Sequence, residues 1–134
     1  MGLIVKSSIL KRASFLATLT FISTITSLTG ASAHTVLVAS SPSRDSIQAV
    51  SPREISLRFA EALLTLSGHE INRIYLFDPS HKAIKLGKST VKSTILSATI
   101  LSRSLINGLY LVKYRVTADD GHVVNGSYTF TLKN

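Results

Sequence analysis

The feature that most constrains the fold is a series of short segments rich in β-branched and aromatic residues. In the segment EISLRF (54–59), Ile55, Leu57 and Phe59 alternate with three polar residues, so one face is apolar and the other polar. Comparable segments cover residues 35–39, 54–59, 71–78, 93–101, 109–116 and 126–132, and a weaker one covers 83–86. These patterns predict β-strands.

Turn-forming residues separate these segments. They include SSPSRDS (40–46), DPSHK (78–82), Asn107-Gly108 and DDGH (119–122). About seven short strands with regular turn signals predict an all-β fold, an immunoglobulin-like Greek-key β-sandwich with a single domain. The segment AEALLTLSGH (60–69) predicts either a short helical turn or a loop between sheets. Six aromatic residues are candidates for the inner faces or their edges: Tyr75, Phe77, Tyr110, Tyr114, Tyr128 and Phe130.

The first 33 residues have the organisation of a secretory signal peptide. Lys6, Lys11 and Arg12 precede an uncharged stretch (13–30), and the small residues Ala-Ser-Ala follow at 31–33. The alternative is a membrane anchor, but a membrane-spanning helix needs about 20 predominantly apolar residues, and this stretch is shorter and rich in Ser and Thr. We therefore expect cleavage after Ala33, export of the protein, and one mature domain at 34–134.

The charge and sulfur content of the mature chain restrict its partners. Three of the 15 Lys and Arg residues and none of the seven acidic residues lie in the leader, so the net charge falls from +8 to about +5. The basic residues at 82, 85, 88 and 92 have no interleaved aromatic residues, which predicts a solvated face and no nucleic-acid partner. Cysteine is absent and Met1 leaves with the leader, so a soluble, monomeric protein without sulfur ligands is expected.

Two of the four histidines, His34 and His122, lie in contexts that suggest metal binding. The other two, His69 and His81, stand in polar loop-like segments and are expected to be surface residues. His122 follows Asp120 by two residues, and residues two apart in an extended chain point to the same side. The alternative is an Asp-Gly turn beside a surface histidine.

His34 strengthens the metal-binding interpretation. After cleavage its free α-amine and Nδ1 would chelate one ion, because an amine with a pKa of about 8 yields its proton to a divalent metal. Together with His122 and Asp120 this gives three nitrogen donors and one oxygen. A donor set without thiolate suits Cu(II), and less well Ni(II), in tetragonal geometry, whereas Zn²⁺ prefers a tetrahedron.

Four segments of the chain resemble the CopC family of periplasmic copper-resistance proteins. They are AHTVLVASSP (33–42), ISLRFAEAL (55–63), NGLYLVKYRV (107–116) and DGHVVNGSYTFTL (120–132), in the family's order and spacing. The resemblance implies a β-sandwich with a Cu(II) site at one end, called a histidine brace. Its ligands would be His34 through amine and Nδ1, His122 through its other ring nitrogen, and Asp120. Glu61 matches a family glutamate near the metal, with a solvated carboxylate as the alternative.

The chain departs from the family pattern near this site. Members often have Ser-x-Asp-Gly-His-Pro, whereas this chain has Ala118 before the aspartates and Val123 after the histidine. Asp119 adds a second carboxylate. A methionine-rich Cu(I) site found in some relatives is absent, which argues against copper transfer between two oxidation states.

The sequence therefore predicts an exported, non-enzymatic Cu(II)-binding protein that acts in copper homeostasis or resistance. It would sequester copper or deliver it to a membrane transporter, for which the resemblance implies a CopD-like inner-membrane partner. Two other functions remain open: a histidine-brace copper monooxygenase, and an adhesion or interaction sandwich without metal.

Overall fold

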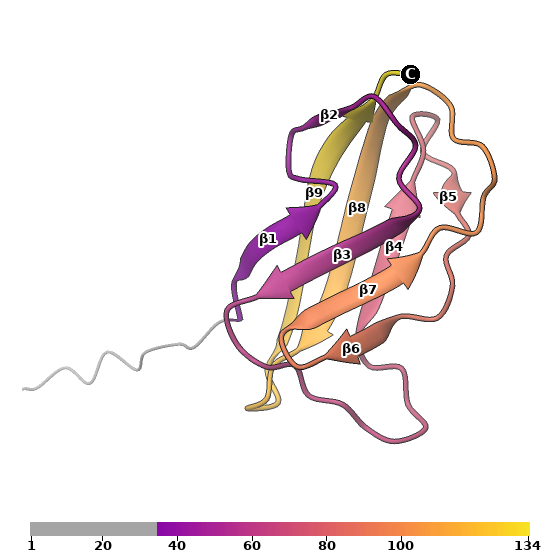
Figure 1. The fold of residues 1–134 in the computed structure, drawn as a ribbon. Coiled ribbons are helices and arrows are strands. Elements are labelled where there is room, and N and C mark those ends of the chain that lie inside the picture. The colour runs from indigo at the N-terminus through magenta and orange to yellow at the C-terminus, as the bar shows by residue number, and fades with distance from the viewer. Residues whose placement is uncertain (1–34) are drawn as a thin grey trace, which may run out of the picture. The chain divides into compact units, whose positions relative to one another are not determined.

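Nine β-strands form two sheets in the computed structural model, which describes residues 35–134 (Figure 1). The strands are β1 (Leu37–Ser41), β2 (Ile47–Gln48), β3 (Glu54–Phe59), β4 (Arg73–Phe77), β5 (Ala83–Ile84), β6 (Thr90–Lys92), β7 (Ile95–Thr99), β8 (Gly108–Thr117) and β9 (Val123–Leu132). Residues 35–134 contain no helix, and hence no helical segment that could cross a bilayer. The predicted leader and its cleavage site lie outside the described residues.

The two sheets have the orders β1-β3-β7-β6 and β2-β9-β8-β4-β5. Neighbouring strands are antiparallel, except that β2 pairs with β9 in parallel. Consecutive strands repeatedly change sheet, and Figure 1 shows the four-stranded sheet lying across the five-stranded one. The predicted all-β sandwich is confirmed.

The core lies between the sheets and follows the alternation of the strands. In β3, Ile55, Leu57 and Phe59 are buried, as the period of two predicts. Aromatic side chains fill much of the space between the sheets. The Tyr110 and Phe130 rings stack at 5.2 Å, and the Phe59 ring meets Tyr114 edge to face at 5.4 Å.

Segment 60–69 is a loop that crosses from β3 in one sheet to β4 in the other, which confirms the second of the two alternatives predicted for it. Leu63 in this loop is buried in the core and pairs with Ala118. Other details differ from the sequence-based expectation. Tyr75 is exposed rather than inward-facing, since Ile74 and Leu76 occupy the inner face of β4. The short strands β2 and β6 have no alternating pattern of useful length and were not predicted.

Candidate metal centre

Four strand ends and one loop meet at the end of the sandwich where the candidate site lies. Leu37 at the start of β1 pairs with Phe59 at the end of β3, and the Ala60 N–H donates to the Val36 carbonyl at 2.9 Å. At the end of the hairpin, Thr117 of β8 pairs with Val123 of β9. The bridge between Leu63 and Ala118 connects the 60–72 loop to this hairpin.

A tight turn at residues 118–122 positions Asp120 and His122. The Ala118 N–H donates to the His122 carbonyl at 2.8 Å, and the Gly121 N–H donates to the Ala118 carbonyl at 2.9 Å. Gly121 has φ of +87°, a left-handed conformation that glycine adopts without the steric cost of a side chain. The turn, rather than an extended strand, brings the two side chains to one side.

Both carboxylate oxygens of Asp120 bind His122. Oδ1 accepts the backbone N–H of His122 at 3.0 Å, which is an Asx-turn, and Oδ2 lies 2.8 Å from Nδ1 of the imidazole. With a hydrogen on Nδ1, the ring donates to the carboxylate and its Nε2 carries a lone pair. The His122 side chain is 72% exposed and that of Asp120 is 43% exposed, so Nε2 is accessible to a ligand.

The same contacts keep Asp120 ionised. The backbone N–H of His122, and after it the imidazole, stabilise the charged form and hold the pKa of the Asp120 carboxyl below its usual value. An ionised carboxylate fixes the orientation of the ring and favours the tautomer in which Nε2 is free. This arrangement is typical of an imidazole prepared to bind a metal, and it also occurs in surface turns.

Of the other predicted site residues, the structure describes only Glu61. His34 lies outside the described residues. Glu61 is exposed on the loop after β3, two residues before the Leu63–Ala118 bridge. Within residues 35–134, no three side chains of His, Asp or Glu come together as a potential metal-binding group, so Glu61 does not join Asp120 and His122 there.

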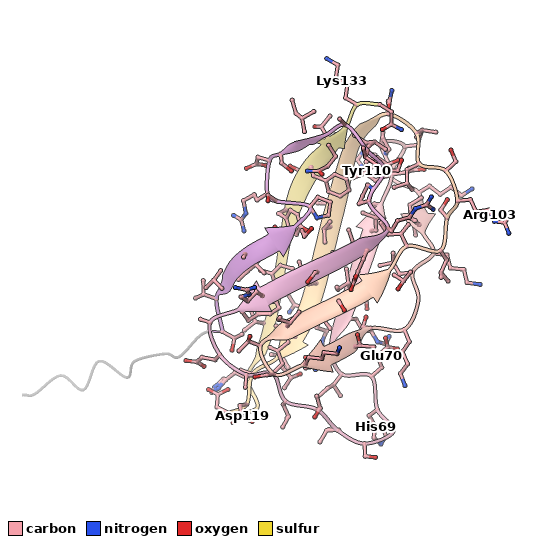
Figure 2. All side chains as sticks on the ribbon, viewed as in Figure 1. His69, Glu70, Arg103, Tyr110, Asp119 and Lys133 are labelled. Carbon is pink, nitrogen blue, oxygen red and sulfur yellow. The ribbon has the colours of Figure 1, made fainter. Side chains whose placement is uncertain are left out.

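His69 and His81 occupy other loops, as expected. Figure 2 shows His69 on the 60–72 loop, well separated from Asp119 on the hairpin. His81 belongs to the 78–82 turn, where Oδ1 of Asp78 accepts the backbone N–H groups of Ser80 and Lys82. Both histidines are exposed.

Asn72 supports the site and was not identified from the sequence. Its side chain is 4% exposed; Nδ2 donates to the Leu64 carbonyl at 2.7 Å, and Oδ1 accepts the Thr117 N–H at 2.8 Å. The Leu64 N–H in turn donates to the Thr117 carbonyl at 2.9 Å. Asn72 thus joins the 60–72 loop to the end of β8, directly before the turn that carries Asp120.

Sequence comparison identifies the family. The CopC domain model matches residues 37–133, which include nearly all of the described sandwich and the Asp120–His122 turn. The chain belongs to the CopC family. Copper resistance protein C from Xanthomonas campestris pv. juglandis is 33% identical over 104 residues, 75% of this chain and 81% of that protein. Copper resistance protein C from Pseudomonas syringae pv. tomato is 30% identical over 131 residues, 93% of this chain and 99% of that protein.

Solved CopC-family structures have the same fold. CopC from Methylosinus trichosporium OB3b aligns with a TM-score of 0.65 and 31% identity over 75% of this chain and 94% of that chain. PcoC, a methionine-rich copper resistance protein from Escherichia coli, aligns with a TM-score of 0.62 and 28% identity over 75% of this chain and 100% of that chain. The family thus includes a methionine-rich protein, whereas Met1 is the only methionine here.

Proposed function

We propose that this CopC-family protein is an exported copper-binding protein that contributes to copper resistance or homeostasis. The observation that carries the proposal is the Asp120–His122 pair, whose 2.8 Å contact leaves Nε2 free on an exposed imidazole. Its relatives named copper resistance protein C support copper as the ligand. The proposed role is binding and transfer rather than catalysis.

The proposed site combines the Asp120–His122 pair with the mature N-terminus. Cleavage after Ala33 would leave His34 with a free amine that chelates through this amine and Nδ1. His34 is two residues from Val36, and two residues extend at most about 7 Å. Val36 is itself fixed to Ala60 at the same end of the sandwich. The covalent chain would therefore allow the His34 donors to reach that end.

Asp120 has two functions in this proposal. It orients His122 through Nδ1, and its carboxylate oxygens retain lone pairs that can contribute to the metal or compensate its charge. Glu61 follows Ala60 directly and is the remaining carboxylate proposed near the metal, as a supporting group or occasional ligand.

The donor atoms favour Cu(II) as the bound state. Nitrogen and oxygen donors in a tetragonal set suit Cu(II), whereas soft thioether and thiolate ligands select Cu(I). The mature chain would contain neither methionine nor cysteine. We therefore propose a single Cu(II) site and a periplasmic location, with sequestration of copper or its delivery to an inner-membrane transporter of the CopD type.

Thermal unfolding with and without Cu(II) tests this function, because a ligand of the native state raises Tm by mass action. Protein beginning at His34 is expected to be stabilised by Cu(II). Asp120→Ala should lower the copper affinity about 10–100-fold, the usual cost of losing a group that orients a ligand, and His122→Ala should lower it further. His69→Ala and His81→Ala are the matched controls and should bind as the parent does. Equal binding by all four variants would exclude the site.

A further inference from the structure

The outer face of the five-stranded sheet carries an uncompensated group of basic residues. Strands β4, β8 and β9 contain Arg73, Lys113 and Arg115 but neither aspartate nor glutamate. Within residues 35–134 no lysine or arginine lies within 4.0 Å of a carboxylate oxygen, since the His122–Asp120 contact is the one ion pair found there. The charge of this face is therefore free to act on a partner.

Two of these residues stand directly opposite each other. Arg73 of β4 and Arg115 of β8 are Cα partners in the antiparallel register, and both side chains are exposed. Like charges directly opposite on neighbouring strands destabilise a sheet. A local arrangement that costs stability without an ion pair to offset it is characteristic of a functional surface.

Both guanidinium groups are held in place. Nε of Arg73 donates to the Glu70 carbonyl at 3.2 Å, and Nη1 of Arg115 donates to the Ile71 carbonyl at 3.3 Å. Because Glu70 and Ile71 are consecutive residues, the two guanidinium groups lie beside the same short segment of the chain. Each guanidinium keeps further N–H donors, and their fixed fork matches the two oxygens of a carboxylate.

An open groove continues from this pair along the edge of the sheet. It has a volume of about 430 Å³, and its lining includes Arg73, Tyr75 and Lys88. Glu70 also lines it, and its Oε1 accepts the Ser89 N–H at 3.0 Å; within residues 35–134 its carboxylate makes no contact under 4.0 Å with an arginine or lysine. The groove thus offers an aromatic surface and a third cation, Lys88, beside the arginine pair.

We infer that Arg73 and Arg115 form a docking site for an acidic polypeptide segment of a partner protein. Discrete carboxylates fit two fixed guanidinium forks, whereas an anionic membrane surface responds to net charge without such geometry. The Arg115–Asn125 pair lies two residues from the Thr117–Val123 pair that precedes the Asp120 turn, a distance of about 7 Å along the strand. A docked segment would lie next to the proposed copper site, but the inference does not depend on copper.

Fluorescence anisotropy with labelled hexaglutamate at low salt tests the inference, with hexaglutamine as the neutral probe. Arg73→Gln/Arg115→Gln should weaken hexaglutamate binding about tenfold or more, since each hydrogen bond to a charged group contributes at least about one factor of ten. Arg58→Gln/Lys92→Gln removes the same charge from exposed positions on the four-stranded sheet and should change the affinity less than about twofold if the arginine pair is the site.

Three results would overturn the inference. Equal losses in the two double variants would indicate a diffuse basic surface, and full binding by Arg73→Lys/Arg115→Lys would exclude the guanidinium geometry. Binding to phosphatidylglycerol vesicles without binding to hexaglutamate would assign the face to a membrane. The Gln pair should have a Tm equal to or above the parent's, because it removes the like-charge pair, and should keep the parent's Cu(II) affinity. These two readouts separate loss of docking from misfolding and from failure of the copper site.

Discussion

Asn72 provides a sharp test of how the sandwich supports the candidate site. Asn72→Ala removes the partner of the Leu64 carbonyl and of the Thr117 N–H, both in a buried environment. Each buried backbone group left without a partner costs about 1–3 kcal/mol, so the loss should be about 2–6 kcal/mol. Since small domains have about 5–15 kcal/mol of stability, this is a large fraction.

Asn72→Asp isolates the donated hydrogen bond. Oδ1 can still accept the Thr117 N–H, but an ionised carboxylate would place its second oxygen against the Leu64 carbonyl, 2.7 Å from the present Nδ2. Protonation restores a donor, so the folded variant should bind a proton more readily than the unfolded chain. Its stability deficit should therefore be largest at neutral pH and diminish as the pH falls toward 4, near the ordinary pKa of aspartate, which is about 3.9.

Urea unfolding monitored by circular dichroism measures both variants. For Asn72→Ala, Tm should also fall by at least about 8 °C, from about 4–8 °C per kcal/mol in a domain of this size. Asn125 is exposed and makes no hydrogen bond through its side chain within residues 35–134, so Asn125→Ala and Asn125→Asp are matched controls with expected changes within about 0.5 kcal/mol. A loss below about 1 kcal/mol in Asn72→Ala would show that water replaces the amide and that the two backbone groups are not left without partners.

Two further predictions concern the core. A Cβ on Gly126 would overlap the Tyr114 side chain, so Gly126→Ala should destabilise the protein by about 1–3 kcal/mol in denaturant unfolding. Gly87→Ala is the control and should not destabilise it, because the nearest atom to a Cβ there is 3.7 Å away. Equal effects of the two substitutions would show that the overlap with Tyr114 is not the cause. Burial raises the pKa of Tyr128 to about 12. The folded state therefore holds the phenolic proton more tightly than the unfolded chain does, and the free energy of unfolding should fall as the pH rises from about 10 to 12. Tyrosinate absorbance should show a late ionisation that Tyr128→Phe abolishes; its persistence in that variant would assign it to another tyrosine.

The sequence predicted those parts of the fold that are determined by residues close together in the chain. The bounds of β3 and its buried face follow from alternation alone. The extended geometry predicted for Asp120 and His122 was wrong, because the alternative Asp-Gly turn brings them together. The pairing of Arg73 with Arg115 and the hydrogen bond between Asn72 and Thr117 join residues 42 and 45 positions apart along the chain. Such contacts are set by sheet register, which a single sequence does not specify.

We propose that a free amine on His34 completes a copper site with His122 and Asp120. Titration of Cu(II) into protein beginning at His34, and into a twin with an acetylated α-amine, tests this directly by affinity and by electron paramagnetic resonance. We expect tight binding and a nitrogen-rich tetragonal spectrum for the free amine, with weaker binding and loss of the amine nitrogen for the acetylated twin. Equal affinity and identical spectra would show that the amine is not a ligand.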